Sequence, residues 1–250
     1  MNKKIEIIEM RKSFEDREVI RGLCLDVYEG EILCVVGKSG SGKSVIMKHL
    51  IGILEPDSGT IIVDGTDYTA ADDETRRSIE SKYGILFQGA ALFDSMNIYD
   101  NVAFGLRRKG IPESEIRDTV PEMLTQVGLK GVEHRQPGEL SGGMQKRVGL
   151  ARSIALKPEI MLYDEPTTGV DPITGGAVDR LITHTRDTFR VTSIVVTHDM
   201  RSAYRISDRI AMLHEGKIIF TGVPDDFRTT DDPRVKQFTE GRAHGPIKVL

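Results

Sequence analysis

The sequence predicts an α/β fold in which a helical insertion interrupts an alternation of strands and helices. Three observations predict it. Short apolar strands alternate with helical stretches in both halves of the chain, a glycine-rich loop joins a strand to a helix after residue 36, and residues 98–129 have helical periodicity only. With 250 residues, the chain is long enough to bury a sizeable core, in one large domain or in one domain with a small lobe.

Each element follows from apolar periodicity and from the glycine, proline and charged turns around it. Alternating or continuous apolar runs predict strands at 4–10, 19–27, 31–36, 60–63, 83–87, 160–163, 192–196, 209–213 and 217–221. Helical spacing predicts helices at 43–54, 74–81, 173–187 and 201–206 and a helical insertion at about 95–157. The charge-rich tail has too few apolar residues for its own core. We therefore expect one domain at 1–232 and a tail at 233–250.

Composition disfavours several classes of protein. The 34 Lys and Arg against 38 Asp and Glu give a net charge of −4, which disfavours nucleic-acid binding. Apolar runs such as 32–36 are too short to cross a bilayer, and Glu6 interrupts the apolar segment that an export signal needs. We therefore expect a cytosolic chain. Its two cysteines, Cys24 and Cys34, lie in short apolar runs, and we expect buried reduced thiols.

A phosphate-binding loop is predicted between the strand at 31–36 and the helix that follows. The pattern G-x-x-x-x-G-K-[ST] is matched by eight consecutive residues: Gly37, Lys38, Ser39, Gly40, Ser41, Gly42, Lys43 and Ser44. The glycines let backbone N–H groups surround phosphate oxygens at the positive end of a helix. We expect Lys43 to reach the β- and γ-phosphates and Ser44 to bind a nucleotide-bound Mg²⁺. The alternative is a glycine-rich turn without a ligand.

Two adjacent carboxylates, Asp164 and Glu165, end the apolar strand at 160–163. In an open parallel sheet, ligands bind at that edge. We expect Asp164 to orient Mg²⁺ through water and Glu165 to accept a proton from, or polarise, the attacking water. The alternative is a solvated strand end, although the Pro-Thr-Thr-Gly sequence at 166–169 makes this combination much less common.

These motifs, with two others, occur in the order of a known family. The others are the run Leu-Ser-Gly-Gly-Met-Gln-Lys-Arg at 140–147 and His198, which follows a predicted strand. Across about residues 5–230, the chain resembles the ATP-binding cassette (ABC) ATPases. The resemblance implies a P-loop NTPase fold with a RecA-like parallel sheet core, an antiparallel β-subdomain and a helical subdomain insertion. It also implies ATP hydrolysis, with ATP and Mg²⁺ bound.

The resemblance assigns roles to three residues outside the phosphate loop. Gln88 falls at the family's metal- and water-contacting glutamine, and His198 at its γ-phosphate contact, although a lone histidine is more often a packed or surface residue. Phe14 falls where an aromatic ring stacks on adenine. It lacks the hydroxyl of the usual tyrosine, which changes adenine affinity modestly.

The run that begins at Leu140 predicts a second anion site. Ser141 followed by Gly142, Gly143 and Met144 has the pattern of a helix N-cap with free N–H groups that bind phosphate. Two anion sites separated by an insertion are awkward for one nucleotide in a monomer. In a head-to-tail pair of subunits, each phosphate loop faces the other copy's Ser141 helix. On the family resemblance, residues 168–171 occupy the segment that touches the opposite subunit. The resemblance therefore implies an ATP-sandwich homodimer. Met144 stands where the family most often has glutamine.

Three local features are similar to the Mla-type (MCE-associated) phospholipid transport ATPases: the run at 89–93, Met144, and the segment 237–246. This likeness implies an integral membrane permease, an MCE-domain substrate-binding protein and, in some systems, a STAS-domain protein as partners, and no nucleic acid. It places the chain peripherally at the cytoplasmic face of the inner membrane. The alternatives are the ATPase of another importer for amino acids or other small solutes, a soluble cassette ATPase, and a P-loop kinase.

Two segments are expected to contact other chains. Residues 89–104 correspond to the region that docks on the permease, and their exposed-looking apolar residues suit a groove; a plain core contribution is the alternative. These residues are Leu92, Phe93 and Met96. The tail is expected to pack across the second subunit through Val235, Phe238, Ile247 and Val249.

Overall fold

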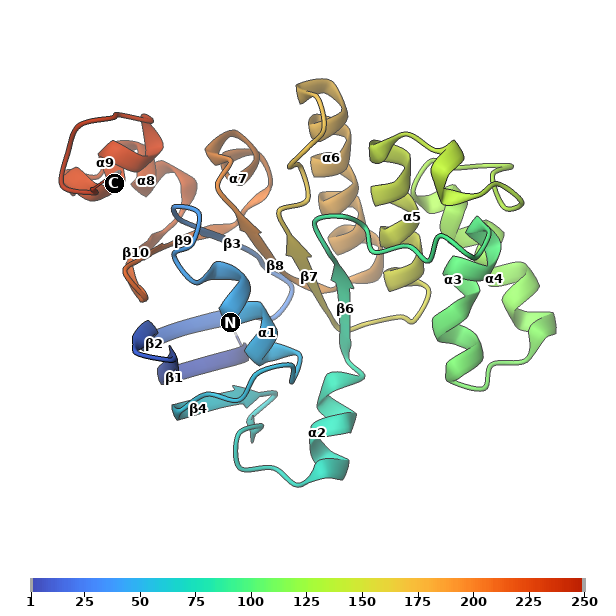
Figure 1. Cartoon of the computed structure of the whole chain (residues 1–250), viewed down its shortest axis with the longest axis horizontal. Helices are drawn as coiled ribbons and strands as arrows, with labels where there is room; N and C mark the ends of the chain where they lie inside the picture. The colour runs from blue at the N-terminus through green and yellow to red at the C-terminus, as the bar shows by residue number, and fades with distance from the viewer. Residues whose placement is uncertain (1, 249–250) are drawn as a thin grey trace. The chain divides into compact units, whose positions relative to one another are not determined.

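The computed structural model describes residues 2–248 and divides the chain into two compact units (Figure 1). Of the described residues, the first unit comprises 2–82 and 192–248, and the second comprises 83–191. The second unit is thus inserted in sequence between two halves of the first.

The first unit contains an antiparallel sheet with the strand order β2-β1-β4-β5. Its strands are β1 (Lys3–Phe14), β2 (Arg17–Tyr28), β4 (Ser58–Val63) and β5 (Thr66–Asp67). Ile5 and Ile7 of β1 are buried and Glu6 between them is not, because successive side chains of a strand face opposite sides. The antiparallel β-subdomain implied by the family resemblance is therefore present.

The first unit also contains parallel strands. β3 (Ile32–Val36) is parallel to β8 (Thr192–Thr197) and to β9 (Arg209–His214), and β10 (Lys217–Gly222) pairs antiparallel with β9. Every residue of β3 and β8 is buried, which is typical of strands covered on both faces. The helices of this unit are α1 (Lys43–Leu50), α2 (Asp73–Glu80), α7 (Met200–Ile206), α8 (Pro224–Thr229) and α9 (Pro233–Thr239).

The end of α1 differs from the expected helix at 43–54. The helix ends at Leu50, and Gly52 then adopts a left-handed conformation with φ +73°. The backbone N–H groups of Ile53 and Leu54 both donate to the carbonyl of Lys48, which satisfies an end carbonyl of the helix. Ile53 and Leu54 thus continue the apolar pattern beyond the helix, and the predicted boundary is four residues too late.

The second unit joins two parallel strands through helices. The strands are β6 (Tyr83–Leu86) and β7 (Ile160–Asp164). The helices are α3 (Ile98–Arg108), α4 (Glu113–Gln126), the 3-10 helix η1 (Pro137–Glu139), α5 (Gly142–Ile154) and α6 (Pro172–Phe189). α3, α4 and α5 contact one another and bury Val102, Val120 and Val148 (Figure 1). The helical insertion predicted between strands 83–87 and 160–163 is confirmed.

The two cysteines differ in burial. Cys34 in β3 is buried as predicted, but the prediction is wrong for Cys24, which is exposed. Cys24 alternates with buried Leu23 and Leu25 and so lies on the outer face of β2, where its thiol donates a hydrogen bond to Oε1 of Glu9 at 3.2 Å. An apolar run therefore does not bury all of its residues here, because only one face of β2 packs against the core and successive side chains point to opposite faces.

The tail is part of the first unit, and some of its apolar residues are buried there. Val235 in α9 and Ile247 are buried, and Gln237 joins the helix to the later residues. The Gln237 Nε2 donates to the Ile247 carbonyl at 2.9 Å, and the Ile247 N–H donates to Oε1 of Gln237 at 2.7 Å. Two of the four predicted anchors are therefore covered by the chain itself. Phe238 is half-buried, and Val249 lies outside the described residues.

Gly59 in β4 allows a test of close packing between β4 and β1. A Cβ at Gly59 would lie 2.5 Å from the carbonyl oxygen of Glu9, and φ is +95°. We expect Gly59→Ala to lower the free energy of unfolding by about 3 kcal/mol in urea denaturation, because backbone strain adds to a backbone clash. The matched control is Gly65→Ala, where φ is +75° and no described atom lies within 4 Å of the added Cβ. It should cost about 1 kcal/mol, from strain alone. If both variants lost the same free energy of unfolding, the backbone clash at Gly59 would be contradicted.

Candidate functional site

The phosphate loop lies between β3 and α1, as predicted, and its backbone requires glycine. Gly42 is the N-cap of α1 with φ +107°, and Gly40 has φ +76°. A Cβ on Gly37 would lie 2.4 Å from the carbonyl oxygen of Leu213 in β9. The first turn of α1 contains no acidic residue, so nothing there opposes an anion at the helix N-terminus. The loop is therefore a fixed cradle of backbone N–H groups.

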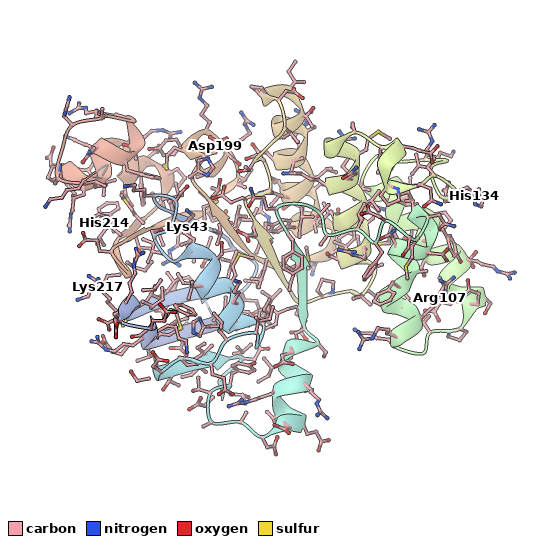
Figure 2. The ribbon with its side chains drawn as sticks, viewed as in Figure 1. Lys43, Arg107, His134, Asp199, His214 and Lys217 are labelled. Atoms are coloured by element: carbon pink, nitrogen blue, oxygen red, sulfur yellow. The ribbon has the colours of Figure 1, made fainter. Side chains whose placement is uncertain are left out.

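Lys43 is buried at the start of α1 (Figure 2). Its Nζ donates to the carbonyls of Gly37 at 2.8 Å and Lys38 at 3.3 Å, so the ammonium group curls back over the loop. The hydroxyl of Ser41 is also buried and has no hydrogen-bond partner within residues 2–248. A buried hydroxyl of this kind is a donor for a bound phosphate. The chemistry of this loop thus fits the phosphates of a nucleotide.

His198 and Phe14 belong to the same unit as the phosphate loop. The parallel register places Val36 opposite Thr197, so Gly37 and His198 follow paired strands at one edge of the sheet. The Asp199 N–H donates to Oγ1 of Thr197 at 3.0 Å, and the Asp199 carboxylate caps α7, which fixes the turn next to His198. Phe14 ends β1 with 40% of its surface exposed.

Gln88, Asp164 and Glu165 lie together in the second unit. Because Leu86 of β6 pairs with Tyr163 of β7, all three lie at or just after the ends of these strands, at the same sheet edge. Glu165 adopts a left-handed conformation with φ +48°, unusual for a residue other than glycine. Thr168 closes the turn: its N–H donates to the Glu165 carbonyl and its hydroxyl to Oε2 of Glu165, each at 3.1 Å. The turn thus holds the carboxylate in one direction.

The predicted N-cap at Ser141 is present in the second unit. The Ser141 hydroxyl accepts a hydrogen bond from the Met144 N–H at 3.3 Å. Gly142 is exposed, and a Cβ added to it would have no described atom within 4 Å, which leaves its backbone accessible to an anion. Gly143 packs against α6, because a Cβ there would lie 2.5 Å from Cγ2 of Thr174.

The segment 168–171 is anchored at the start of α6. Asp171 is the N-cap and accepts hydrogen bonds from the N–H groups of Ile173 and Thr174 and from the Thr174 hydroxyl. These bonds, first among them the one from the Thr174 hydroxyl, hold the pKa of Asp171 below its usual range. Thr174 therefore contacts both Asp171 and the position of Gly143.

Sequence reasoning missed two residues that hold the segment after Gln88. Buried Asn101 donates to the carbonyls of Phe93 and Met96 at 3.1 and 3.0 Å. Arg152 donates to the carbonyls of Ala90 and Ala91 at 2.9 and 2.7 Å. The sequence signal for Asn101 was a polar residue among the apolar residues of a predicted helix. No sequence signal pointed to the role of Arg152.

The apolar residues of the same segment are only partly exposed. Phe93 has 40% of its surface exposed, as predicted. Leu92 and Met96 are half-buried, so the prediction that they are exposed is wrong for these two. Asn101 of α3 accepts a hydrogen bond from the Phe93 N–H at 2.8 Å and donates one to the Met96 carbonyl at 3.0 Å, which holds the segment next to this helix. None of the helices in residues 2–248 is both long enough and apolar enough to cross a membrane.

Three curated relatives match nearly the whole chain. A ribonucleotide transport ATP-binding protein, mkl, from Mycobacterium leprae is 43% identical over 99% of this chain and 72% of its own length. The chloroplastic protein TRIGALACTOSYLDIACYLGLYCEROL 3 of Arabidopsis thaliana is 40% identical over 98% and 75%. The intermembrane phospholipid transport system ATP-binding protein MlaF of Haemophilus influenzae is 38% identical over 98% and 93%. The names of the first and third relatives both state ATP binding, but they give different transported molecules, a ribonucleotide and a phospholipid.

Solved structures and a family model give the same family. The structure of cbiO1 from Clostridium perfringens, part of the ABC transporter complex cbiONQ, has a TM-score of 0.85 and 27% identity and covers 97% of both chains. The dimeric post-hydrolysis structure of the cassette MJ0796, bound to ADP and Pi, has a TM-score of 0.79 and 28% identity and covers 88% of this chain and 98% of that one. Residues 20–168 match the ABC transporter family model. The predicted P-loop NTPase fold is confirmed, and the chain belongs to the ABC transporter family as an ATP-binding, ATP-hydrolysing subunit.

Proposed function

We propose that two copies of this chain dimerise on ATP and drive an integral membrane permease that moves phospholipid between the inner and outer membranes. The observation that carries the dimer is the presence of two helix N-termini, at Gly42 and at Ser141, of the kind that bind anions. The similarity to MlaF over most of both chains supports the phospholipid substrate. The dimeric MJ0796 cassette supports the assembly.

In the proposed site, the phosphate loop of one copy binds the β- and γ-phosphates. Lys43 and the backbone N–H groups of residues 37–42 stabilise their negative charge. Phe14 stacks on adenine, and His198 contacts the γ-phosphate. Residues 141–144 of the second copy bind the γ-phosphate from the opposite side, because the N-terminus of α5 carries the same partial positive charge. ATP thus joins the two copies.

Hydrolysis is assigned to Glu165. The oxygen of a water oriented by Gln88 bonds to the γ-phosphorus, the bond from that phosphorus to the ADP oxygen breaks, and Glu165 accepts the water's proton. ADP and inorganic phosphate are the products. The hydrogen bond from the Thr168 hydroxyl to Oε2 of Glu165 supports this role, because it orients the carboxylate.

The proposed Mg²⁺ donors are the Ser44 hydroxyl, the Gln88 side-chain oxygen and the Asp164 carboxylate, the last through water. Hard oxygen donors of this kind, few in number and supplemented by phosphate oxygens, suit Mg²⁺. The register of β6 and β7 supports this set, since it brings Gln88 and Asp164 to one edge. When bound, the ion neutralises charge on the phosphates.

The proposed partners are the permease, an MCE-domain substrate-binding protein and a STAS-domain protein, with the chain at the cytoplasmic face of the inner membrane and no nucleic acid bound. Residues 89–104 are the proposed contact with the permease, through exposed Phe93. The proposed domain boundary remains at residue 232, and the tail contributes to the dimer through Phe238 and the exposed residues 240–246. A chain ending at Asp232 that dimerises on ATP as readily as the full chain would contradict this role of the tail.

The name of the mkl relative favours a second substrate, a ribonucleotide. To separate the two, we propose to isolate the complex of the tagged chain from detergent-solubilised membranes of its source organism. Mass spectrometry then identifies the co-purified permease and its bound small molecules. We expect an integral membrane protein with bound phospholipid. A permease with bound ribonucleotide and no phospholipid contradicts the phospholipid assignment, and ribosomes or nucleic acid in place of a permease contradict transport.

A further inference from the structure

Lys146 is a buried cation in α5 that contacts the loop after Glu165. Only 6% of the residue is exposed. Its Nζ donates hydrogen bonds to the carbonyls of Pro166 at 2.7 Å and Thr168 at 2.6 Å. Burial lowers the pKa of Lys146, although the charge of Glu165 opposes this shift. An ammonium group is costly to bury and is retained where its hydrogen bonds are needed.

These bonds place Lys146 between two parts of the proposed site. α5 begins at Ser141, whose N-cap is the proposed phosphate contact of this helix, and Lys146 lies in the second turn. Residues 165–168 form the turn in which Thr168 donates to the carbonyl and to Oε2 of Glu165. The Lys146 side chain therefore connects α5, the helix proposed to bind the partner's nucleotide, to Thr168. Thr168 in turn orients the Glu165 carboxylate.

We propose that Lys146 is a positioning residue for ATP hydrolysis, which couples the position of α5 to the Glu165 carboxylate through the backbone of Thr168. The inference rests on the proposed function, because it takes Glu165 as the proton acceptor and Ser141 as a phosphate contact. Lys146 does not touch the nucleotide. Its two charge-assisted hydrogen bonds keep residues 166 and 168 at a fixed distance from α5, so that a shift of the helix on phosphate binding also moves the turn.

The coupling distinguishes Lys146 from a lysine that only stabilises the second unit. A merely structural lysine affects the folded fraction and leaves the turnover number of the folded enzyme unchanged. A positioning lysine affects turnover and leaves ATP binding unchanged, since Lys146 is not one of the residues proposed to bind the nucleotide. The backbone strain at Glu165, with φ +48°, makes its turn dependent on such external contacts.

The first test compares Lys146→Met with Lys146→Arg in the full chain. Methionine retains the length of the side chain and removes every donor, so we expect kcat to fall about 100-fold, as for a catalytic group displaced by 1 Å, with the Kd for ATP unchanged. Arginine retains the charge and donors in a different shape and should recover about a tenth of the parent kcat. Parent turnover in Lys146→Met, or equal turnover in both variants, would overturn the proposal.

The control for folding is Ser153→Ala, on the same helix. The hydrogen bonds of the buried Ser153 hydroxyl go to the carbonyls of Ile85 at 2.6 Å and Gly149 at 3.0 Å, neither of which belongs to residues 165–168. We expect this variant to lower the melting temperature and to retain the parent kcat. A loss of kcat equal to that of Lys146→Met would show that any lost hydrogen bond in α5 has the same effect, and would overturn the proposal.

Thr168→Val, alone and combined with Lys146→Arg, gives a second test that does not depend on the folding of Lys146→Met. It removes the hydroxyl that donates to Glu165 while leaving the carbonyl that accepts from Lys146. We expect Thr168→Val to have a lower kcat than the parent. The double variant that also carries Lys146→Arg should be no slower than the slower of the two single variants, because both substitutions act on the same turn. If the losses of kcat caused by the two substitutions multiply in the double variant, Lys146 and Thr168 act independently, which would contradict the proposal. If Glu165→Gln hydrolyses ATP normally, the proposed function fails; if only the Lys146 variants are normal, this inference alone fails.

Discussion

We expect Glu165→Gln to lower the kcat of ATP hydrolysis about 1,000-fold and to leave ATP binding intact, because the substitution removes the proposed general base. The substitution retains the size of the side chain and removes its ability to accept a proton. It changes no residue of the phosphate loop at 37–44. ATP therefore remains bound, and the ATP-joined dimer accumulates because hydrolysis no longer separates the two copies.

Two measurements check this result. Phosphate release gives kcat, and light scattering after size exclusion gives the dimer fraction with and without ATP. The matched control is Glu159→Gln, because Glu159 is an exposed glutamate directly before the other end of the same strand β7. It should hydrolyse ATP at the parent rate. A Glu165→Gln variant with normal turnover, or one that stays monomeric with ATP, would remove Glu165 from its proposed role.

The parts of the fold and site that can be predicted from the sequence are those set by local chemistry. The phosphate loop is one, because the left-handed backbone at Gly40 and Gly42 requires glycine at those positions. The N-cap at Ser141 is another, since it needs only a side-chain oxygen three residues before a backbone N–H. Both lie at a junction between a loop and a helix, where a few neighbouring residues decide the backbone conformation.

The rest depends on contacts between residues distant in sequence. Lys146 stands in a recognised motif, yet its role is visible only when its ammonium group is found on carbonyls about 20 residues later in the chain. The apolar neighbours of Cys24 favour a place in the core, and only the pairing of β2 with β1 shows which face it occupies. Apolar periodicity therefore locates elements better than it assigns the faces of their individual side chains.

The dimer requires an experiment that separates a site shared by two copies from a site within one. Lys43→Ala removes the ammonium group from the phosphate loop. Ser141→Asp retains a good N-cap for α5 and places a negative charge where the phosphate of the other copy is proposed to bind. We expect each variant alone to hydrolyse ATP at least about 100-fold more slowly than the parent, because each homodimer lacks one half of both sites.

Mixing the two variants should restore activity. In a mixed dimer, the intact phosphate loop of the Ser141→Asp copy faces the intact Ser141 of the Lys43→Ala copy, while the other site carries both defects. With equal amounts, half of the dimers are mixed and each has one working site, so the mixture should reach about a quarter of the parent rate. Ser141→Asn is the matched control, since it caps the helix without a charge and should retain most of the activity alone. A mixture no faster than the average of its two components would mean that each chain completes its own site, and the proposed dimer would have to be abandoned.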